Sequence, residues 1–208
     1  MRYRIKICGL TDAGQALAAA SVGADAIGLV FYARSRRAVD IEQAAAIAAA
    51  LPPFVATVGL FVDPAVAEVG RVLDQCRLDF LQFHGAENAA FCGGFGVPYL
   101  KAIAMGDGRD PRPEMDAHPQ ARGFLLDSHA GGKMGGSGQV FDWRSIPGPL
   151  ERPWLLAGGL DARNVGQALA LASPYGVDVS SGVESTPGQK DPRLVRDFIE
   201  SVRQVERE

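Results

Sequence analysis

The amino-acid sequence predicts an α/β protein that folds as a single (β/α)8 TIM barrel over residues 1–208. Short and almost continuously apolar runs alternate with helical stretches along the chain, which is typical of parallel strands that are buried on both faces. A polar residue follows nearly every apolar run, and in a barrel such residues meet at the face where the strands end. The length is that of one domain, at the compact end for this architecture.

The strands are expected where the chain is richest in Ile, Val, Leu and Phe. An open doubly wound sheet is the alternative arrangement of alternating strands and helices. Its dinucleotide-binding form needs a GxGxxG turn after an early strand, whereas the first apolar run ends in Cys8-Gly9-Leu10-Thr11-Asp12. The closed barrel is therefore favoured, with eight strands at Arg4–Cys8, Ala26–Phe31, Val55–Phe61, Phe80–Phe83, Tyr99–Ala104, Gly123–Leu126, Trp154–Ala157 and Val177–Val179.

Helices are expected between these strands. Asp40 with Gln43 predicts a capping box, and Asp161 is placed to cap the helix that follows it. Gly, Asp, Arg and Pro in Met105–His118 predict that the fifth helix is short, irregular or absent. The expected helices are Asp12–Ser21, Ile41–Leu51, Ala65–Gln75, Glu87–Gly93, Ala162–Leu171 and Asp191–Val205.

One glycine-rich segment is expected to be a functional loop. Ser128–Gly138 holds five glycines in eleven residues, and a long loop in a compact domain is usually functional. Its part Gly131–Gly138 lies beside Asp127, so we hypothesise that it folds over a substrate as a lid.

Composition excludes several classes of function. A net charge of −3 with scattered signs argues against nucleic-acid binding. No apolar run approaches the roughly 18 residues of a membrane span. Three cysteines without paired spacing, and no signal peptide, predict reduced thiols and a cytoplasmic location. No CxxC, HExxH or Cys/His cluster is present, so no metal site is expected.

Two donor-rich turns follow the last two predicted strands. Gly158-Gly159 follows the seventh strand and Ser180-Ser181-Gly182 the eighth. Barrel enzymes often bind a substrate phosphate with the loops after these two strands, where glycine permits close backbone approach. Ordinary turn residues are the alternative for each turn alone, but both turns together predict a phosphate site.

Four further side chains are expected at the same rim. Cys8 is either a small buried hydrophobe or a base or nucleophile. Asp127, after a very apolar strand, is a loop cap or a general acid. His84 is a hydrogen-bonded structural residue or a ligand contact, and an arginine of Arg34–Arg37 is solvated or faces a substrate carboxylate. Residues expected outside the chemistry are Cys76 and Cys92, which we interpret as structural, and His118 and His129, which we interpret as solvated loop residues.

Several segments together resemble the phosphoribosylanthranilate isomerase family. Any one motif is weak, but the set is in the family's order, spans the whole chain and is highly specific. The segments are Lys6–Gly9, Gly28–Tyr32 with Ser35 and Arg37, Val58–Val62, Leu81–Gly85, Leu126-Asp127, Gly135–Gly138 with Phe141–Trp143, Ala157–Leu160 with Asn164-Val165, and Val177–Glu184 with Pro187-Gly188 and Lys190-Asp191.

The resemblance implies a cofactor-free Amadori rearrangement of N-(5-phosphoribosyl)anthranilate to 1-(2-carboxyphenylamino)-1-deoxyribulose 5-phosphate in tryptophan biosynthesis. By position, Cys8 matches the family's general base and Asp127 its general acid. Arg37 matches the residue that faces the anthranilate carboxylate. The remaining matches are Asp178 beside the sugar hydroxyls, Gly158, Gly159, Ser180 and Ser181 at the phosphate, and His84 at the rim.

Three alternatives remain at this point. The related histidine-pathway aminoaldose isomerase has similar chemistry but uses two aspartates, and Cys8 stands where the first would be. A silent phosphate-binding barrel has no reason to keep both Cys8 and Asp127. A redox role for Cys8 is weakened because no resolving cysteine lies nearby in the sequence. The partner expected is a small phosphosugar, and the chain is expected to be a monomer or a homodimer.

Overall fold

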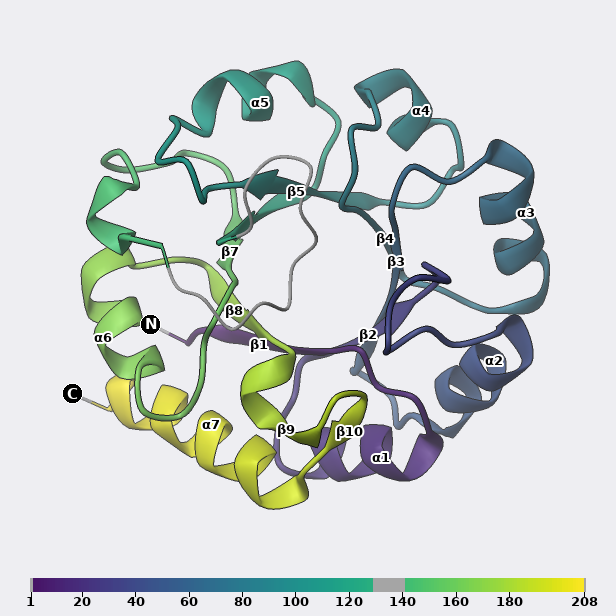
Figure 1. Ribbon diagram of the computed structural model, residues 1–208, viewed down its shortest axis with the longest axis horizontal. Coiled ribbons are helices and arrows are strands. Elements are labelled where there is room, and N and C mark those ends of the chain that lie inside the picture. The colour runs from purple at the N-terminus through teal and green to yellow at the C-terminus, as the bar shows by residue number, and fades with distance from the viewer. Residues whose placement is uncertain (1, 129–140, 208) are drawn as a thin grey trace.

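The computed structural model describes residues 2–128 and 141–207. Within these residues eight parallel strands follow one another around a closed barrel, and β8 pairs with β1 to complete the ring (Figure 1). The predicted (β/α)8 barrel is confirmed, and each strand agrees with its predicted bounds to within one residue. The strands are β1 (Arg4–Cys8), β2 (Ala26–Val30), β3 (Ala56–Phe61), β4 (Phe80–Phe83), β5 (Tyr99–Ala104), β6 (Gly123–Asp127), β7 (Trp154–Leu156) and β8 (Gly176–Val179).

The helices lie around the outside of this barrel (Figure 1). The predicted capping box is present at Asp40, whose carboxylate accepts from Gln43 while the Gln43 side chain accepts from the Asp40 N–H. The fifth helix is short, as predicted. The helices are α1 (Ala13–Ser21), α2 (Ile41–Ala50), α3 (Val66–Gln75), α4 (Ala89–Gly93), α5 (Arg112–Ala117), α6 (Val165–Ala172) and α7 (Pro192–Val205).

The predicted start of α6 at Ala162 is wrong, because the helix begins at Val165. The Asp161 carboxylate accepts hydrogen bonds from the N–H groups of Arg163 and Asn164, at 2.8 and 3.1 Å. The Asn164 side chain accepts in return from the Asp161 N–H at 2.9 Å. Short polar side chains compete with helix formation in this way, so a closed turn precedes the helix.

A small hairpin after the barrel was not predicted. It consists of β9 (Glu184–Thr186) and β10 (Gln189–Lys190), and its strands are too short to show a hydrophobic period. The Thr11 hydroxyl donates to the Gly188 carbonyl at 3.1 Å, and the Lys190 N–H donates to Gln15 at 3.2 Å. The hairpin is thereby attached to the segment that follows β1. Two short 3₁₀ helices, η1 (Trp143–Ser145) and η2 (Ser181–Val183), were also not predicted.

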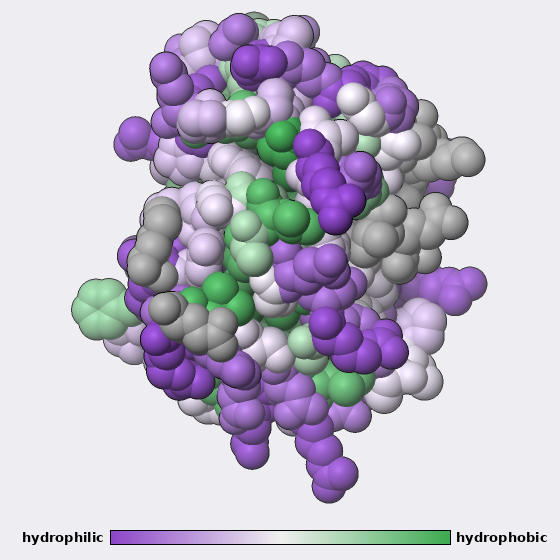
Figure 2. Space-filling model, turned by 90° about the vertical axis from the view of Figure 1, so that its left-hand side faces the viewer, coloured by the Kyte–Doolittle hydropathy of each residue, from purple (hydrophilic) through white to green (hydrophobic). Residues whose placement is uncertain are grey.

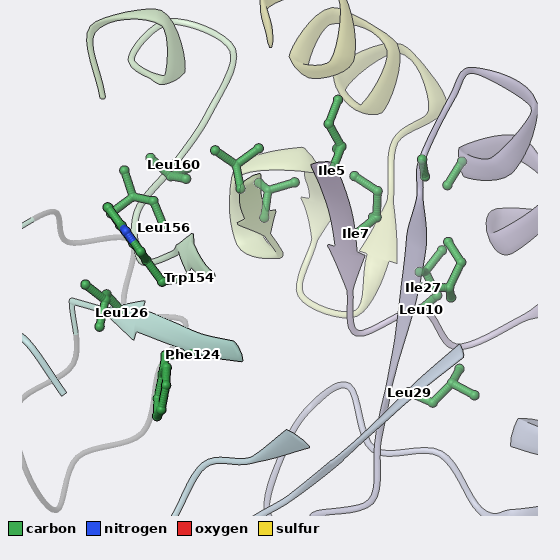
Figure 3. Close-up of a cluster of buried hydrophobic side chains, with 14 of the residues drawn as sticks. Ile5, Ile7, Leu10, Ile27, Leu29, Phe124, Leu126, Trp154, Leu156 and Leu160 are labelled. Atoms are coloured by element: carbon green, nitrogen blue, oxygen red, sulfur yellow. The ribbon is translucent and has the colours of Figure 1, made fainter. Parts of the chain in front are cut away.

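The main hydrophobic core lies between the barrel wall and the helices. Ile5, Ile7 and Ile27 are fully buried there, and Figure 3 shows them with Leu126 and Leu156 from the other side of the cluster. Side chains alternate along a strand, so the neighbours of these core residues face the barrel interior. Lys6 and Cys8 in β1 are two of these interior residues, and both are buried.

The outer surface is predominantly polar on the side that carries α6. Figure 2 shows mainly hydrophilic residues on this face, with the hydrophobic ones in a broken band between them. Single exposed apolar residues are normal for globular proteins. In the part of the chain that the structure describes, no helix is long and apolar enough to cross a membrane.

Candidate active site

A cavity of about 590 Å³ opens at the carboxyl ends of the barrel strands. This volume is within the range of small-molecule sites. Segments that are far apart in the sequence contribute its walls, as expected for the functional face of a barrel. Gly158, Gly159 and Ser181 are not among the described residues that line it. The predicted site residues that do line it are Cys8, Arg37, His84, Asp127, Asp178 and Ser180.

Cys8 ends β1 and is 5% exposed. Gly28 in β2 leaves the space that its sulfur occupies, because a Cβ at Gly28 would lie 2.7 Å from Sγ. Burial raises the pKa of the Cys8 thiol above its ordinary value of 9.0, and the ammonium groups of Lys6 and Lys190 oppose this shift only in part. In the unliganded protein the sulfur therefore keeps its proton at neutral pH.

Lys6 and Asp178 form an ion pair inside the barrel. They are opposite each other in the pairing of β1 with β8, and Nζ lies 2.7 Å from Oδ1. The two side chains are 3% and 9% exposed. Burial alone would lower the pKa of Lys6, but the Asp178 carboxylate outweighs it and raises the pKa to about 12. A fixed positive charge thus lies directly below Cys8, two residues along the same strand.

Asp127 ends β6 and is 6% exposed. His84, which follows β4, places Nε2 at 3.4 Å from Asp127 Oδ2. The other ring nitrogen of His84, Nδ1, lies 3.1 Å from the side-chain nitrogen of Gln82. Gln82 is fully buried in β4. The structure therefore places the predicted acid beside His84, which was predicted at the site, and His84 in turn beside Gln82 of β4, which was not.

Arg37 lines the cavity but is also held by a carboxylate that was not predicted at the site. Its Nε and one terminal nitrogen each lie 2.7 Å from an oxygen of Glu184 in two parallel bonds. Lys190 contacts the same carboxylate at 2.6 Å. Burial would raise the pKa of Glu184, but the bonds from Arg37 and Lys190 outweigh it and lower the pKa below the ordinary 4.5. The predicted contact of Arg37 with a substrate carboxylate stays a prediction.

The two predicted phosphate turns lie against each other. A Cβ on Gly182 would collide with the carbonyl of Leu160, so the turn after β8 packs on the one after β7. Gly158 and Gly159 both have positive φ, 87° and 65°, a conformation that favours glycine. Ser180 is tied to the strand end, because its hydroxyl donates to the Cys8 carbonyl at 2.9 Å. The phosphate assignment of these residues stays a prediction.

Lys101 and Glu87 form a second buried ion pair at the cavity. Lys101 in β5 donates to the Gly85 carbonyl at 2.5 Å and to Glu87 at 3.2 Å. The other oxygen of Glu87 accepts from the N–H groups of Asp63 and Gly85, at 2.8 and 3.2 Å. This pair therefore holds the loops that follow β3 and β4. A lysine within an apolar run, as in Tyr99–Ala104, was the sequence signal for it.

His118, Cys76 and Cys92 lie away from this cavity. His118 is 2% exposed, so the prediction of a solvated residue is wrong. Its Nδ1 lies 3.4 Å from the Tyr99 hydroxyl, a partner that only the fold supplies. Cys76 and Cys92 are buried and free, and neither lines the cavity. His129 and Gly131–Gly138 lie outside the described residues. Residues 2–128 and 141–207 contain no group of three or more His, Cys, Asp or Glu that could hold a metal ion.

Comparisons with known proteins match one family along nearly the full length of this chain. The model of N-(5'-phosphoribosyl)anthranilate (PRA) isomerase matches residues 5–201. The N-(5'-phosphoribosyl)anthranilate isomerase of Acidithiobacillus ferrooxidans is 54% identical over 200 residues, which are 96% of this chain and 97% of that protein. The crystal structure of phosphoribosyl anthranilate isomerase from Thermus thermophilus has a TM-score of 0.85 at 39% identity and covers 97% of this chain and 99% of its own.

Two further solved structures are informative about ligand and assembly. One is the isomerase in complex with reduced 1-(o-carboxyphenylamino)-1-deoxyribulose 5-phosphate, at 34% identity and a TM-score of 0.80, covering 97% of this chain and 99% of its own. The other shows monomers generated from the dimeric isomerase of Thermotoga maritima, at 32% identity and a TM-score of 0.79, with the same coverage. Together with the model match and the close relatives, these similarities show that the chain belongs to the N-(5'-phosphoribosyl)anthranilate isomerase family.

Proposed function

We propose that this chain isomerises N-(5-phosphoribosyl)anthranilate to 1-(2-carboxyphenylamino)-1-deoxyribulose 5-phosphate, a step of tryptophan biosynthesis. The observation that carries the proposal is one cavity lined by both Asp127 and Cys8, in a chain of this family. The rearrangement moves hydrogen from C2 to C1 of the sugar, with no net oxidation. It needs one group that donates a proton and one that removes a proton, and the two residues come from separate strands, β6 and β1.

Asp127 is the general acid in this proposal. It protonates the ring oxygen of the ribose, the C1–O bond breaks, and the nitrogen lone pair forms the C1=N bond of a Schiff base. Its side chain is 9% exposed, so bulk water competes little for the transferred proton. The imidazole of His84 lies beside the carboxyl group, with Nε2 at 3.4 Å from Oδ2.

Cys8 is the general base, and it removes the C2 proton to give an enolamine that tautomerises to the ketone. Only the thiolate can do this. Because burial raises the pKa of Cys8 above its ordinary value, the thiolate is the minor form of the unliganded protein at neutral pH. The ammonium groups of Lys6 and Lys190 are the charges that favour it. On this account kcat/KM increases with pH above neutrality until the thiol titrates.

Substrate binding is assigned to the remaining predicted residues. The bonds to Glu184 occupy two of the five N–H groups of Arg37, so the guanidinium retains donors for the anthranilate carboxylate. Asp178 lines the cavity and can accept from a sugar hydroxyl. The adjoining turns with Gly158, Gly159, Ser180 and Ser181 bind the phosphate through backbone N–H groups.

The test is an assay of anthranilate-type fluorescence, which decreases when the protein is mixed with freshly generated phosphoribosylanthranilate. Cys8→Ala and Asp127→Ala are expected to lower kcat by roughly 10²- to 10⁴-fold, the usual range for acid–base groups. Cys76→Ala is the matched control, a buried thiol outside the cavity, and should keep wild-type kcat. Full activity of either site variant would refute its role. An inactive wild-type protein would refute the reaction, and the histidine-pathway aminoaldose would be assayed next.

A homodimer is proposed as the assembly, with the monomer as the alternative. Phe54 is 103% exposed and has a φ of 71°, which is unusual for a large residue. It borders a second cavity of about 520 Å³ at the amino ends of the strands, whose wall includes Phe80 and Trp154. A second copy of the chain on this face would remove Phe54 from water. The Thermotoga maritima relative, which is dimeric, supports this assembly.

Location and other partners are proposed from the thiols and the net charge of the chain. The free thiols of Cys8, Cys76 and Cys92 support a reducing, cytoplasmic compartment. The net charge of −3 supports a small-molecule substrate rather than a nucleic acid as the ligand. The chain is proposed to act as one domain over residues 1–208, without a cofactor.

A further inference from the structure

Gln82 is a buried polar residue for which the proposed reaction has no use. It is 0% exposed in β4, and its neighbours Leu81 and Phe83 belong to the hydrophobic core. Its side-chain nitrogen lies 3.1 Å from Nδ1 of His84. Its side-chain oxygen has no hydrogen-bond partner within the described residues. Burial of an amide costs stability, so an apolar residue would suit the packing of the core here better than Gln82.

The contact restricts where His84 carries its proton. An amide nitrogen has two hydrogens and accepts no hydrogen bond, so Nδ1 of His84 must be the accepting, unprotonated nitrogen. In a neutral imidazole the proton is then on Nε2. Nε2 is the atom that lies 3.4 Å from Asp127 Oδ2. Gln82 beside Nδ1 and Asp127 beside Nε2 are thus both consistent with a proton on Nε2.

The tautomer in turn determines which oxygen of Asp127 carries the acidic proton. In this tautomer the N–H of Nε2 lies beside Oδ2, and a proton on that oxygen directed at the ring would meet it. The proton of the carboxylic acid is then on Oδ1. We infer that Gln82 is a positioning residue, which fixes His84 as the Nε2–H tautomer and so leaves the proton of Asp127 on the oxygen that is available to the substrate. This inference rests on the acid role proposed for Asp127.

Other contacts of this segment favour a fixed ring. Lys101 in β5 donates to the carbonyls of Phe83 and Gly85, which flank His84 in the chain, at 3.5 and 2.5 Å. The backbone on both sides of His84 is therefore held from below by one ammonium group. Because that contact involves only the backbone, the direction of the imidazole N–H still depends on the side chain of Gln82.

The direct test is ¹⁵N NMR of histidine-labelled protein, which distinguishes protonated from unprotonated ring nitrogens. The chain has only three histidines, so His118→Asn and His129→Asn variants assign the signals. Wild type is expected to show Nε2 protonated and Nδ1 unprotonated at His84. Gln82→Glu replaces the donor by an isosteric acceptor and is expected to move a proton to Nδ1. Gln82→Met, of similar size and without a hydrogen bond, is expected to give a mixture of tautomers.

Activity provides the second readout. Gln82→Glu is expected to lower kcat about tenfold, equivalent to about 1.4 kcal/mol, with KM changed less, because substrate binding does not involve Gln82. A wild-type His84 protonated on Nδ1 would overturn the inference, as would a Gln82→Glu variant with the wild-type nitrogen signals. If the wild-type protein has the expected tautomer but no isomerase activity, the proposed function fails and the tautomer assignment is retained.

Discussion

Removing the charge of Lys6 tests whether the ion pair inside the barrel supports both the fold and the thiol. In Lys6→Met the chain keeps a side chain of similar length, but the Asp178 carboxylate, 9% exposed, loses the ammonium group at 2.7 Å. Removal of one partner from a buried pair typically costs about 3–5 kcal/mol. A chain of this size loses roughly 2–4 °C of Tm per kcal/mol, so the melting temperature should fall by about 6–20 °C.

The same substitution should change the reactivity of Cys8. Lys6 is the cation that opposes the effect of burial on the Cys8 thiol most strongly, so its removal raises the pKa of Cys8 further. At a fixed pH of about 8, Cys8 should then react more slowly with iodoacetamide, since only the thiolate reacts. Cys76→Ala/Cys92→Ala in both backgrounds leaves Cys8 as the sole thiol to be followed.

Two controls separate loss of the pair from a general defect. Lys6→Met with Asp178→Asn replaces both charges, and buried pairs replaced in this way often lose little stability. Arg163→Met removes an exposed partner, 91% exposed and bonded to Asp161, and should change stability by less than about 1 kcal/mol. Urea denaturation measures all four proteins. A loss below about 1 kcal/mol for Lys6→Met, or a double variant less stable than the single one, would refute the reasoning.

Two other perturbations address the rim and the assembly. The pKa of Glu184 is lowered in the folded state, so its contribution to stability is present above its ordinary value of 4.5 and is lost as pH falls through the lower folded value. Glu184→Gln should therefore flatten the decrease in Tm below the ordinary value of 4.5 relative to wild type, and an unchanged decrease would contradict this. Phe54→Ser should shift the protein toward the monomer in light scattering at micromolar concentration with kcat unchanged, because Phe54 borders the cavity at the opposite end from Cys8. A wild-type protein that is already monomeric would refute the proposed dimer.

The barrel could be predicted from the sequence because its signal is local and repeated. Most strands, such as Ala26–Val30 or Gly123–Asp127, are apolar runs whose type can be identified without knowledge of their neighbours. The site followed from the same reasoning, since the carboxyl ends of parallel strands share one face. Cys8, His84 and Asp127 could therefore be placed together before any contact between them was known.

Partners that are distant in the sequence could not be predicted in this way. Lys6 and Asp178 are 172 positions apart and meet only because β8 closes against β1. His118, at the end of α5, likewise contacts the hydroxyl of Tyr99 in β5. The start of α6 was misplaced for a local reason, since Asp161 was predicted as a cap and instead closes a turn before the helix. Hydrophobic periodicity carries no information on any of these polar contacts.

Three buried lysines of this barrel share an arrangement that indicates their role. Lys6, Lys101 and Lys190 are 2%, 1% and 4% exposed, and each is paired with a carboxylate. Buried ion pairs are weak evidence for stability, because desolvation offsets most of the attraction.

Each pair, however, lies directly beside a residue assigned to the chemistry. Lys6 lies below Cys8 in β1, Lys101 binds the backbone that flanks His84, and Lys190 donates to the Ser180 carbonyl at 3.1 Å. Apolar residues of equal volume would fill the same space, but they could not fix a carbonyl or oppose the rise in the pKa of a thiol. The requirement that explains these charges is therefore orientation of the strand ends, and the stability of the barrel rests mainly on the apolar core outside it.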